Sequence, residues 1–257
     1  MSLKIGIVAG EASGDILAAG MLEELARRHP AFSAEGIAGP AMQAAGCRSL
    51  WRDVVAHFAK TRPDVFIGVD SPDFNLGLAR RLKARGIRTA QYVSPSVWAW
   101  REGRAEKIGR SVDRVLCLFP FEPEIYARHG VDAVFVGHPL ADLIPLQTDR
   151  AAARRALGLP ETGRIVALLP GSRMSEVTRL AEPFLATAAW LREREPDVGF
   201  VVPAATARLR AHLEQALAAF PGLDVTITDG QSREVMTAAD CVLLASGTAA
   251  LEAMLLR

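Results

Sequence analysis

Short apolar runs that end in small or acidic turn residues recur along this chain, and a helical pattern follows most of them. Clear runs are residues 4–9, 64–69, 88–93 and 165–169. Strands that alternate with helices pair as parallel neighbours, and continuous apolar runs are typical of strands buried on both faces. The chain is therefore expected to form a doubly wound α/β fold, in which loops at the carboxyl ends of the strands line the ligand crevice.

The length of 257 residues favours two domains. Residues 139–163 interrupt the alternation, because proline, glycine and polar residues surround one short helical stretch there. A second strand and helix series begins after this connection. We therefore place the boundary in it, which gives an N-terminal domain of residues 1–145 and a C-terminal domain of residues 146–257.

Composition excludes several classes of protein. A net charge of +1 gives no reason to expect nucleic acid. The three cysteines, Cys47, Cys117 and Cys241, lie far apart, which argues against a disulfide framework or zinc and fits a reducing compartment. The first apolar run is too short for a signal peptide, and no run reaches the roughly 18 residues of a membrane span. We therefore expect a cytoplasmic protein, with attachment to a membrane surface left open.

The segment Leu168-Leu169-Pro170-Gly171-Ser172-Arg173 has the pattern of a strand followed by a small-residue turn and a helix. Such a turn directs free backbone N–H groups toward an anion, and an arginine adds a planar fork suited to phosphate oxygens. We interpret Gly171, Ser172 and Arg173 as a grip for the diphosphate of an activated donor. An ordinary turn with a solvated arginine is the alternative.

The first strand ends in Gly10-Glu11-Ala12-Ser13-Gly14-Asp15, and a helical pattern begins at Ile16. The spacing of Gly10 and Gly14 matches neither a dinucleotide fingerprint nor a P-loop. Asp15 is suited to cap the following helix. Glu11 and Ser13 are candidates to face the ligand, because they lie at a strand exit.

Asp70 ends the clearest strand and is followed by Ser71-Pro72-Asp73. A carboxylate at the carboxyl end of a strand faces the crevice and can take a proton from an attacking hydroxyl, so Asp70 is our candidate general base. Asp73 is expected to cap a helix over residues 76–85. The alternative for Asp70 is a turn residue bonded to its own backbone.

The strand at residues 88–93 leads into a loop with Trp98, Trp100 and Arg101. The tryptophans are interpreted as a wall for a sugar or acyl chain, with packing at a domain edge as the alternative. A basic stripe follows at every third residue, and it is either a solvated face or a contact for a phosphorylated acceptor or anionic headgroups. Its members are Arg101, Arg104, Lys107 and Arg110.

Two further strand exits carry candidate residues. His138 follows a short strand, but no GxSxG motif accompanies it, so a hydrolytic triad is poorly supported. The last strand opens into small residues, which let a phosphate approach the backbone. Glu252 follows them on the first turns of a helix, placed to accept two ribose hydroxyls, with a plain surface glutamate as the alternative. The small residues are Ser246, Gly247 and Thr248.

Five of these motifs, taken together and in order, resemble the lipid-A-disaccharide synthase family (glycosyltransferase family 19), and the resemblance runs from end to end of the chain. The motifs are residues 10–15, 68–75, 92–101, 168–173 and 246–252.

This resemblance implies a GT-B fold of two Rossmann-like domains, with the second domain incomplete, and an inverting transfer without metal or cofactor. UDP-2,3-diacylglucosamine would donate its sugar to 2,3-diacylglucosamine 1-phosphate (lipid X), giving the β-1,6-linked disaccharide and UDP. The expected place is the inner face of the inner membrane, as a peripheral protein, and a homodimer is a further candidate assembly.

The resemblance also implies roles for residues at matching positions. Asp70 takes the place of the base, and Glu11 and Ser13 that of the acceptor-side loop, to which we add Trp98 and Arg101. The UDP-binding positions are Gly171, Ser172, Arg173, Ser246, Gly247, Thr248 and Glu252.

The chain departs from the family at two places. An apolar and basic helical segment of the family, the expected membrane-docking and acyl-binding patch, is absent between Asp53 and Val54. The sequence also stops at Arg257, directly after the Glu252 helix, where the family continues with an asparagine-containing segment and final helices. We therefore keep two alternatives: an enzyme like UDP-N-acetylglucosamine 2-epimerase, against which residues 94–101 argue, and an inactive UDP-binding fragment.

Overall fold

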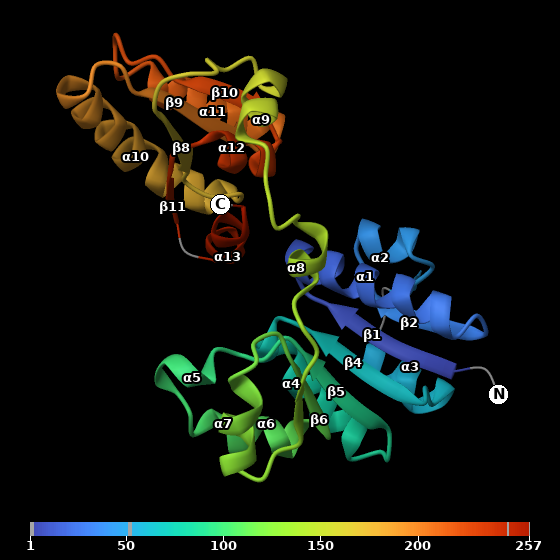
Figure 1. Ribbon diagram of the computed structural model, residues 1–257. Helices are drawn as coiled ribbons and strands as arrows, with labels where there is room; N and C mark the ends of the chain where they lie inside the picture. Colours follow the sequence, from blue (N-terminus) through green and yellow to red (C-terminus); the bar gives the residue numbers. More distant parts are fainter. Residues whose placement is uncertain (1–2, 51–52, 246, 257) are drawn as a thin grey trace. The chain divides into compact units, whose positions relative to one another are not determined.

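The computed structural model describes residues 3–50, 53–245 and 247–256. It divides into two compact units, Met1–Pro139 and Leu140–Arg257. The boundary expected from the sequence, after residue 145, lies just beyond this division. Each unit contains one parallel sheet with helices on its faces (Figure 1).

The N-terminal unit alternates strands and helices throughout. Its elements are β1 (Leu3–Ala9), α1 (Ala12–Arg28), β2 (Phe32–Ile37), α2 (Pro40–Ala44), β3 (Arg48–Ser49), α3 (Val54–Thr61), β4 (Val65–Val69), α4 (Pro72–Lys83), β5 (Arg88–Tyr92), α5 (Val97–Trp100), α6 (Arg104–Ser111), β6 (Arg114–Cys117), α7 (Glu122–Arg128) and β7 (Ala133–Phe135).

The sheet of this unit has the strand order β3-β2-β1-β4-β5-β6-β7, and every pair in it is parallel. The order reverses between β1 and β4, which is the switch point where doubly wound sheets bind ligands. The expected Rossmann-like α/β class is thereby confirmed for this unit.

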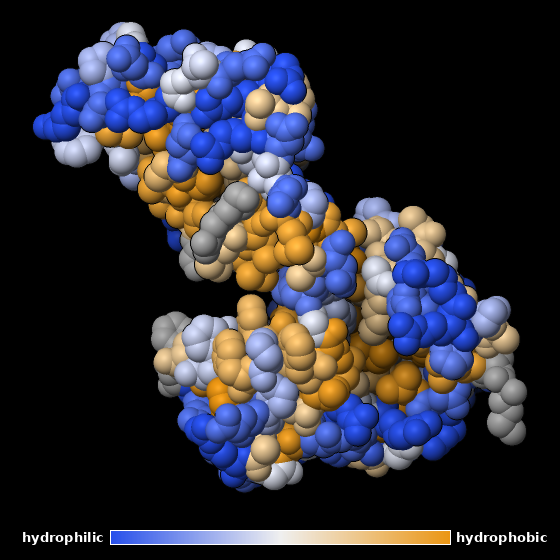
Figure 2. All heavy atoms as spheres, viewed as in Figure 1, coloured by the Kyte–Doolittle hydropathy of each residue, from blue (hydrophilic) through white to orange (hydrophobic). Residues whose placement is uncertain are grey.

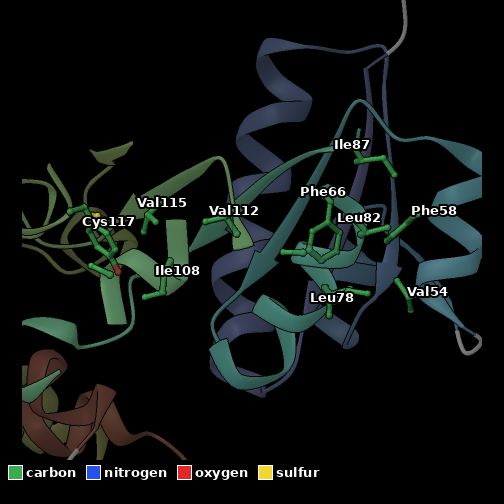
Figure 3. Close-up of a cluster of buried hydrophobic side chains, with 14 of the residues drawn as sticks. Val54, Phe58, Phe66, Leu78, Leu82, Ile87, Ile108, Val112, Val115 and Cys117 are labelled. Atoms are coloured by element: carbon green, nitrogen blue, oxygen red, sulfur yellow. The ribbon is translucent and has the colours of Figure 1, made fainter. Parts of the chain in front are cut away.

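Two apolar clusters cover the two faces of the sheet, because successive side chains of a strand point to opposite sides. Phe66 and Ile67 of β4 illustrate this, since they belong to different clusters. Figure 3 shows Phe66 with Phe58 of α3 and Leu82 of α4 on one side of the sheet. Both faces are therefore buried, as the apolar runs predict.

The C-terminal unit repeats this plan with a smaller sheet in the order β10-β9-β8-β11, again entirely parallel. The second Rossmann-like domain is thus also confirmed. The elements after β7 are α8 (Pro139–Leu143), α9 (Arg150–Ala156), β8 (Ile165–Leu169), α10 (Met174–Arg194), β9 (Gly199–Ala204), α11 (Ala207–Leu217), β10 (Thr226–Asp229), α12 (Ser232–Ala238), β11 (Cys241–Leu244) and α13 (Thr248–Leu255).

Hydrophobic residues are unevenly distributed over the surface of the C-terminal unit. Figure 2 shows hydrophobic residues gathered around α13, where Met254 is 55% exposed. No helix within the described ranges combines the length and the apolar character needed to cross a bilayer.

The three cysteines have different environments, and all are free thiols. Cys47 and Cys117 are buried, and burial raises the pKa of their thiols to about 11 and about 12 respectively. Cys241 lies exposed at the start of β11. Reactive thiolate is therefore suppressed at the two buried positions.

Gly36 of β2 lies against the backbone of β1, so a side chain there is expected to disrupt the sheet. A Cβ at Gly36 would lie 1.6 Å from the backbone oxygen of Ile7. Gly36→Ala should lower the free energy of unfolding by about 3 kcal/mol or more, measured by urea denaturation. Gly20→Ala is the matched control, because nothing lies within 4 Å of its Cβ position on α1; it should stabilise by roughly 0.5–1 kcal/mol. Equal effects of the two changes would contradict the close strand contact.

Candidate active site

The carboxyl ends of β1, β4 and β5 lie side by side in the N-terminal sheet, since Ala9 pairs with Val69 and Val69 with Tyr92. Two glycines bring the first loop against the second. A Cβ at Gly10 would lie 2.5 Å from Ser71 Oγ, and one at Gly14 would lie 3.5 Å from Asp70 Cβ. The structure therefore brings the Glu11–Ser13 segment and Asp70 together.

Asp70 follows β4 directly and is half-buried. Within the described residues its carboxylate makes no hydrogen bond or ion pair, so the alternative of an aspartate tied to its own turn is not seen. Its backbone is unusual, because Asp70 and Ser71 have φ values of 52° and 41°. Non-glycine residues in this left-handed region are strained by about 1–3 kcal/mol each and often occur at functional sites.

The segment with Glu11 and Ser13 differs locally from the expectation. Helix α1 begins at Ala12 rather than at Ile16, with the exposed Glu11 as its N-cap residue and Ser13 in its first turn. Asp15 therefore does not cap its own helix. Its buried carboxylate accepts hydrogen bonds from the backbone N–H groups of Ala41 (2.8 Å) and Met42 (3.1 Å) and so caps α2.

Asp73 also differs from the expectation. Helix α4 begins at Pro72, so Asp73 lies in its first turn, and its exposed carboxylate pairs with Arg104 at 3.1 Å. Arg104 and Lys107 line a groove of about 180 Å³ between α4 and α6. The predicted basic stripe is thus in part an ion-paired face.

Trp98 of α5 is 48% exposed and belongs to a row of aromatic rings. It contacts Phe121 edge to face at 5.4 Å, and Phe121 stacks on Phe119 at 5.6 Å. Neither phenylalanine is among the site candidates that the sequence motifs indicated. Their position at the exit of β6, the neighbour of β5, is the signal that could have indicated them.

Two further candidates are Arg101, which follows Trp98 by three residues, and His138, whose ring lies beside Phe119. Arg101 is exposed and ends α5. The ring of His138 lies 6.5 Å from that of Phe119, and burial lowers the pKa of its imidazole. His138 is therefore biased toward its neutral form.

A buried polar cluster lies under the aromatic row. Ser94 Oγ and Tyr126 OH are 3.0 Å apart, and the N–H of Phe119 donates to the carboxyl group of Glu122 at 3.0 Å. Glu122 is 2% exposed, and burial raises the pKa of its carboxyl group more than the hydrogen bonds lower it. These contacts fasten the loop that carries Trp98 to α7.

In the C-terminal unit, the turns after β8 and β11 lie next to each other. Leu169 pairs with Leu244, and the N–H of Ala245 donates to the oxygen of Leu169 at 3.1 Å. Gly171 has φ 139°, and a Cβ there would lie 2.6 Å from Glu176 Cβ. The structure thus brings residues 171–173 close to the turn that leads into α13.

The backbone N–H groups that were expected to hold a bound anion already donate to a carboxylate of the protein, that of Glu176. The carboxylate of Glu176 accepts hydrogen bonds from the N–H groups of Ser172 (3.1 Å) and Arg173 (3.2 Å). Arg173 Nη1 also lies 3.2 Å from Glu176 Oε1. Glu176 was not predicted as a site residue, although its spacing after Arg173 is that of a capping box.

Glu252 lies on α13, and its carboxylate pairs with Arg233 Nε of α12 at 2.6 Å. Gly247 caps α13 with φ 125°, and Thr248 is the first residue of that helix. The candidate Ser246 lies outside the described residues. Among the residues that are described, no group of three histidine, cysteine or acidic side chains could hold a metal ion.

A family model described as "Lipid-A-disaccharide synthetase" matches residues 5–54 and 50–257. The lipid-A-disaccharide synthase of Chromohalobacter salexigens is 52% identical over 278 residues, covering 98% of this chain and 72% of the relative. That of Hahella chejuensis is 47% identical over 280 residues, covering 99% and 71%. A Xanthomonas campestris relative is 50% identical over 281 residues, with 99% and 64% covered.

Solved structures with the same fold are more distant in sequence. Anabaena Alr3699/HepE in complex with UDP-glucose has a TM-score of 0.61 and 15% identity, covering 99% of this chain and 78% of that one. UDP-GlcNAc 2-epimerase from Neisseria meningitidis has a TM-score of 0.65 and 9% identity, with 95% and 78% covered. At these identities the comparison concerns the fold, and it agrees with the expected GT-B class.

The two matches of the family model meet at residues 50–54, where the internal segment of the family was expected and not found. The alignments with relatives, at 278 to 281 positions, are longer than the chain of 257 residues. Some positions of the relatives therefore have no counterpart here.

Relative to the unmodified protein, the Glu122→Gln variant should gain free energy of unfolding as the pH rises. The folded state holds the Glu122 proton above the ordinary pKa of 4.5, so the native chain binds more protons than the unfolded chain there and loses stability as the pH increases. Glutamine keeps an acceptor for the N–H of Phe119 without a charge. Urea denaturation of both proteins between pH ~4 and pH ~8 should show a difference in unfolding free energy that grows with pH. A difference independent of pH would contradict a buried, ionising Glu122.

Proposed function

The chain belongs to the lipid-A-disaccharide synthase family, and we propose that it joins UDP-2,3-diacylglucosamine to lipid X, forming lipid A disaccharide 1-phosphate and UDP. The observation that carries this proposal is the family match along nearly the whole chain, at about 50% identity to named synthases. The geometry of the two sheet edges is compatible with it, because a candidate base and a candidate diphosphate turn each lie at a carboxyl edge.

On the acceptor side, Asp70 takes the proton from the attacking sugar hydroxyl. Three observations support this role: the carboxylate is half-buried, it has no partner among the described residues, and it sits on a strained turn at the switch point. Glu11 and Ser13 line the same edge. Trp98 offers an aromatic face to a sugar or acyl chain, and Arg101 offers a cation to the phosphate of lipid X.

On the donor side, the leaving diphosphate takes hydrogen bonds from the turn Gly171–Arg173 and from the Arg173 guanidinium. Because Glu176 now accepts those backbone bonds, its carboxylate must move away when a diphosphate binds. The backbone at Gly247 and Thr248 approaches the phosphates from the neighbouring turn. Ser246, which lies outside the described residues, is included from its place in the sequence alone. Glu252 accepts the ribose hydroxyls through the oxygen that Arg233 leaves open.

We extend the proposal to location and partners. The lipid substrates require contact with a membrane, so we place the protein in the cytoplasm, peripherally on the inner face of the inner membrane. A homodimer is included as the candidate assembly.

A UDP-release assay tests the reaction. The chain is mixed with UDP-2,3-diacylglucosamine, with and without lipid X, and UDP and the disaccharide are quantified. UDP formed only with lipid X, together with disaccharide, supports the transfer. UDP binding without turnover identifies an inactive UDP-binding protein, and conversion of UDP-N-acetylglucosamine alone identifies an epimerase. Either of these results would replace the proposed function.

Asp70→Asn should reduce kcat by at least ~100-fold, because a general base contributes about that much or more. The Kd for UDP, measured by calorimetry, should stay unchanged, since the base acts on the acceptor. Asp73→Asn is the matched control: it removes an exposed carboxylate three residues away and should keep most of the activity. Equal losses in the two variants would remove Asp70 from its proposed role.

Arg173→Ala should weaken UDP binding by roughly 10- to 100-fold, the loss expected for charged hydrogen bonds of about 1.5–3 kcal/mol. Glu176→Gln should act in the opposite direction and tighten binding by up to roughly fivefold, because it removes a negative charge from the diphosphate position and keeps the cap. Arg179→Ala, an exposed arginine of the same helix, is the control. Weaker UDP binding by Glu176→Gln would show that the carboxylate supports the site instead of competing for it.

A further inference from the structure

Two fully buried amide side chains lie under the Asp70 turn. Asn75, on the first turns of α4, and Gln91, on β5, are both 0% exposed. Asn75 Nδ2 donates to the oxygen of Asp70 at 2.8 Å, and Gln91 Nε2 donates to the same oxygen at 3.0 Å. The two amides therefore converge on the carbonyl group of the candidate base.

Each amide also contacts a second carbonyl oxygen, one at the end of β4 and one just after β5. Asn75 Nδ2 donates to the oxygen of Val69 at 3.1 Å. Gln91 Nε2 lies 3.4 Å from the oxygen of Val93, which begins the loop that carries Trp98. The pair thus joins the exits of β4 and β5 through side chains as well as through the sheet.

The backbone that the amides hold is strained. Val93 has φ 73°, a conformation that is a clear outlier for a β-branched residue, and it lies beside the left-handed Asp70 and Ser71. Such conformations persist only where the surroundings enforce them. Sheet hydrogen bonds hold the N–H groups of Asp70 and Val93, at 2.9 Å to the oxygen of Tyr92 and 3.1 Å to that of Leu116. The amide of Gln91 reaches the carbonyl oxygens of the same two residues, at 3.0 Å and 3.4 Å.

The same amides have a cost to stability. Within the described part of the chain, Asn75 Oδ1 and Gln91 Oε1 are buried and accept no hydrogen bond. An unsatisfied buried acceptor costs about 1–3 kcal/mol. Gly68 makes room for both side chains, since a Cβ there would lie 2.8 Å from Asn75 Cβ and 3.0 Å from Gln91 Oε1. Stability alone would favour apolar residues at this place.

We propose that Asn75 and Gln91 are positioning residues. They set the direction of the Asp70 carboxylate and its position relative to the segment from Val93 to Trp98. This inference rests on the proposed function, in which Asp70 is the base. It assigns the amides an effect on the rate of transfer that is exerted through Asp70, without contact to either substrate.

The kinetic test uses Gln91→Met, which keeps the length of the side chain and removes both its donor and its orphaned oxygen. It should lower kcat roughly 10- to 100-fold, the usual effect of a small misplacement of a catalytic group, and leave the Kd for UDP unchanged. In an Asp70→Asn background it should cause no further loss, because its effect passes through Asp70. Equal losses in both backgrounds would overturn the proposal.

Thr89→Val is the matched control. Thr89 is another buried polar residue of β5, and its hydroxyl donates to Asp113 at 3.1 Å at the opposite end of the strand. This change should lower the melting temperature and leave kcat near the unmodified value. A loss of kcat equal to that of Gln91→Met would show that any buried polar defect in β5 slows the reaction.

A crystal structure of Gln91→Met and one of Asn75→Leu give a readout that is independent of turnover. We expect Asp70, Ser71 or Val93 to leave the left-handed region in these variants. If all three keep their positive φ values, the positioning role is refuted, whatever the activity. If the unmodified chain does not form disaccharide, the proposed function is refuted, and the crystal structures still decide whether the amides hold the turn.

Discussion

Parallel strand pairing is the constraint on which the rest of this structure depends. Because all strands of a sheet run in one direction, the residues that follow them gather at one edge, however far apart they are in sequence. The pairing of Ala9 with Val69 and of Val69 with Tyr92 brings Glu11, Asp70 and the Trp98 loop together. The pairing of Leu169 with Leu244 does the same for Arg173 and the start of α13.

The fold and the site segments could be predicted because they depend on local patterns. Apolar runs, small turn residues and helical spacing were enough to predict both sheets. They also located the loops after the strands, in which the candidate site residues lie. The partners of individual side chains could not be predicted in the same way. Asp15 caps α2 instead of its own helix, and Asp73 pairs with Arg104, because both partners approach only in the folded chain. The amide pair beneath Asp70 depends likewise on tertiary contacts.

In both halves of the candidate nucleotide site, the groups expected to bind the nucleotide already have a partner within the protein. The backbone donors after β8 hold the Glu176 carboxylate, and Glu252 is paired with Arg233. In both places an internal partner occupies the groups that the proposal assigns to the nucleotide. A nucleotide bound as proposed would exchange these contacts for new ones, and its net affinity would reflect the difference between them. The site on the N-terminal sheet is different, because Asp70 has no such partner among the described residues.

The contrast among the three thiols has a practical consequence for following this protein in solution. Two thiols are enclosed and resist deprotonation, whereas Cys241 is accessible at the first position of β11. A maleimide dye would thus attach at a single native position without mutagenesis. Since a strand advances about 3.3 Å per residue, the dye would sit roughly 13 Å from the turn that leads into α13, close enough for its fluorescence to report on that turn.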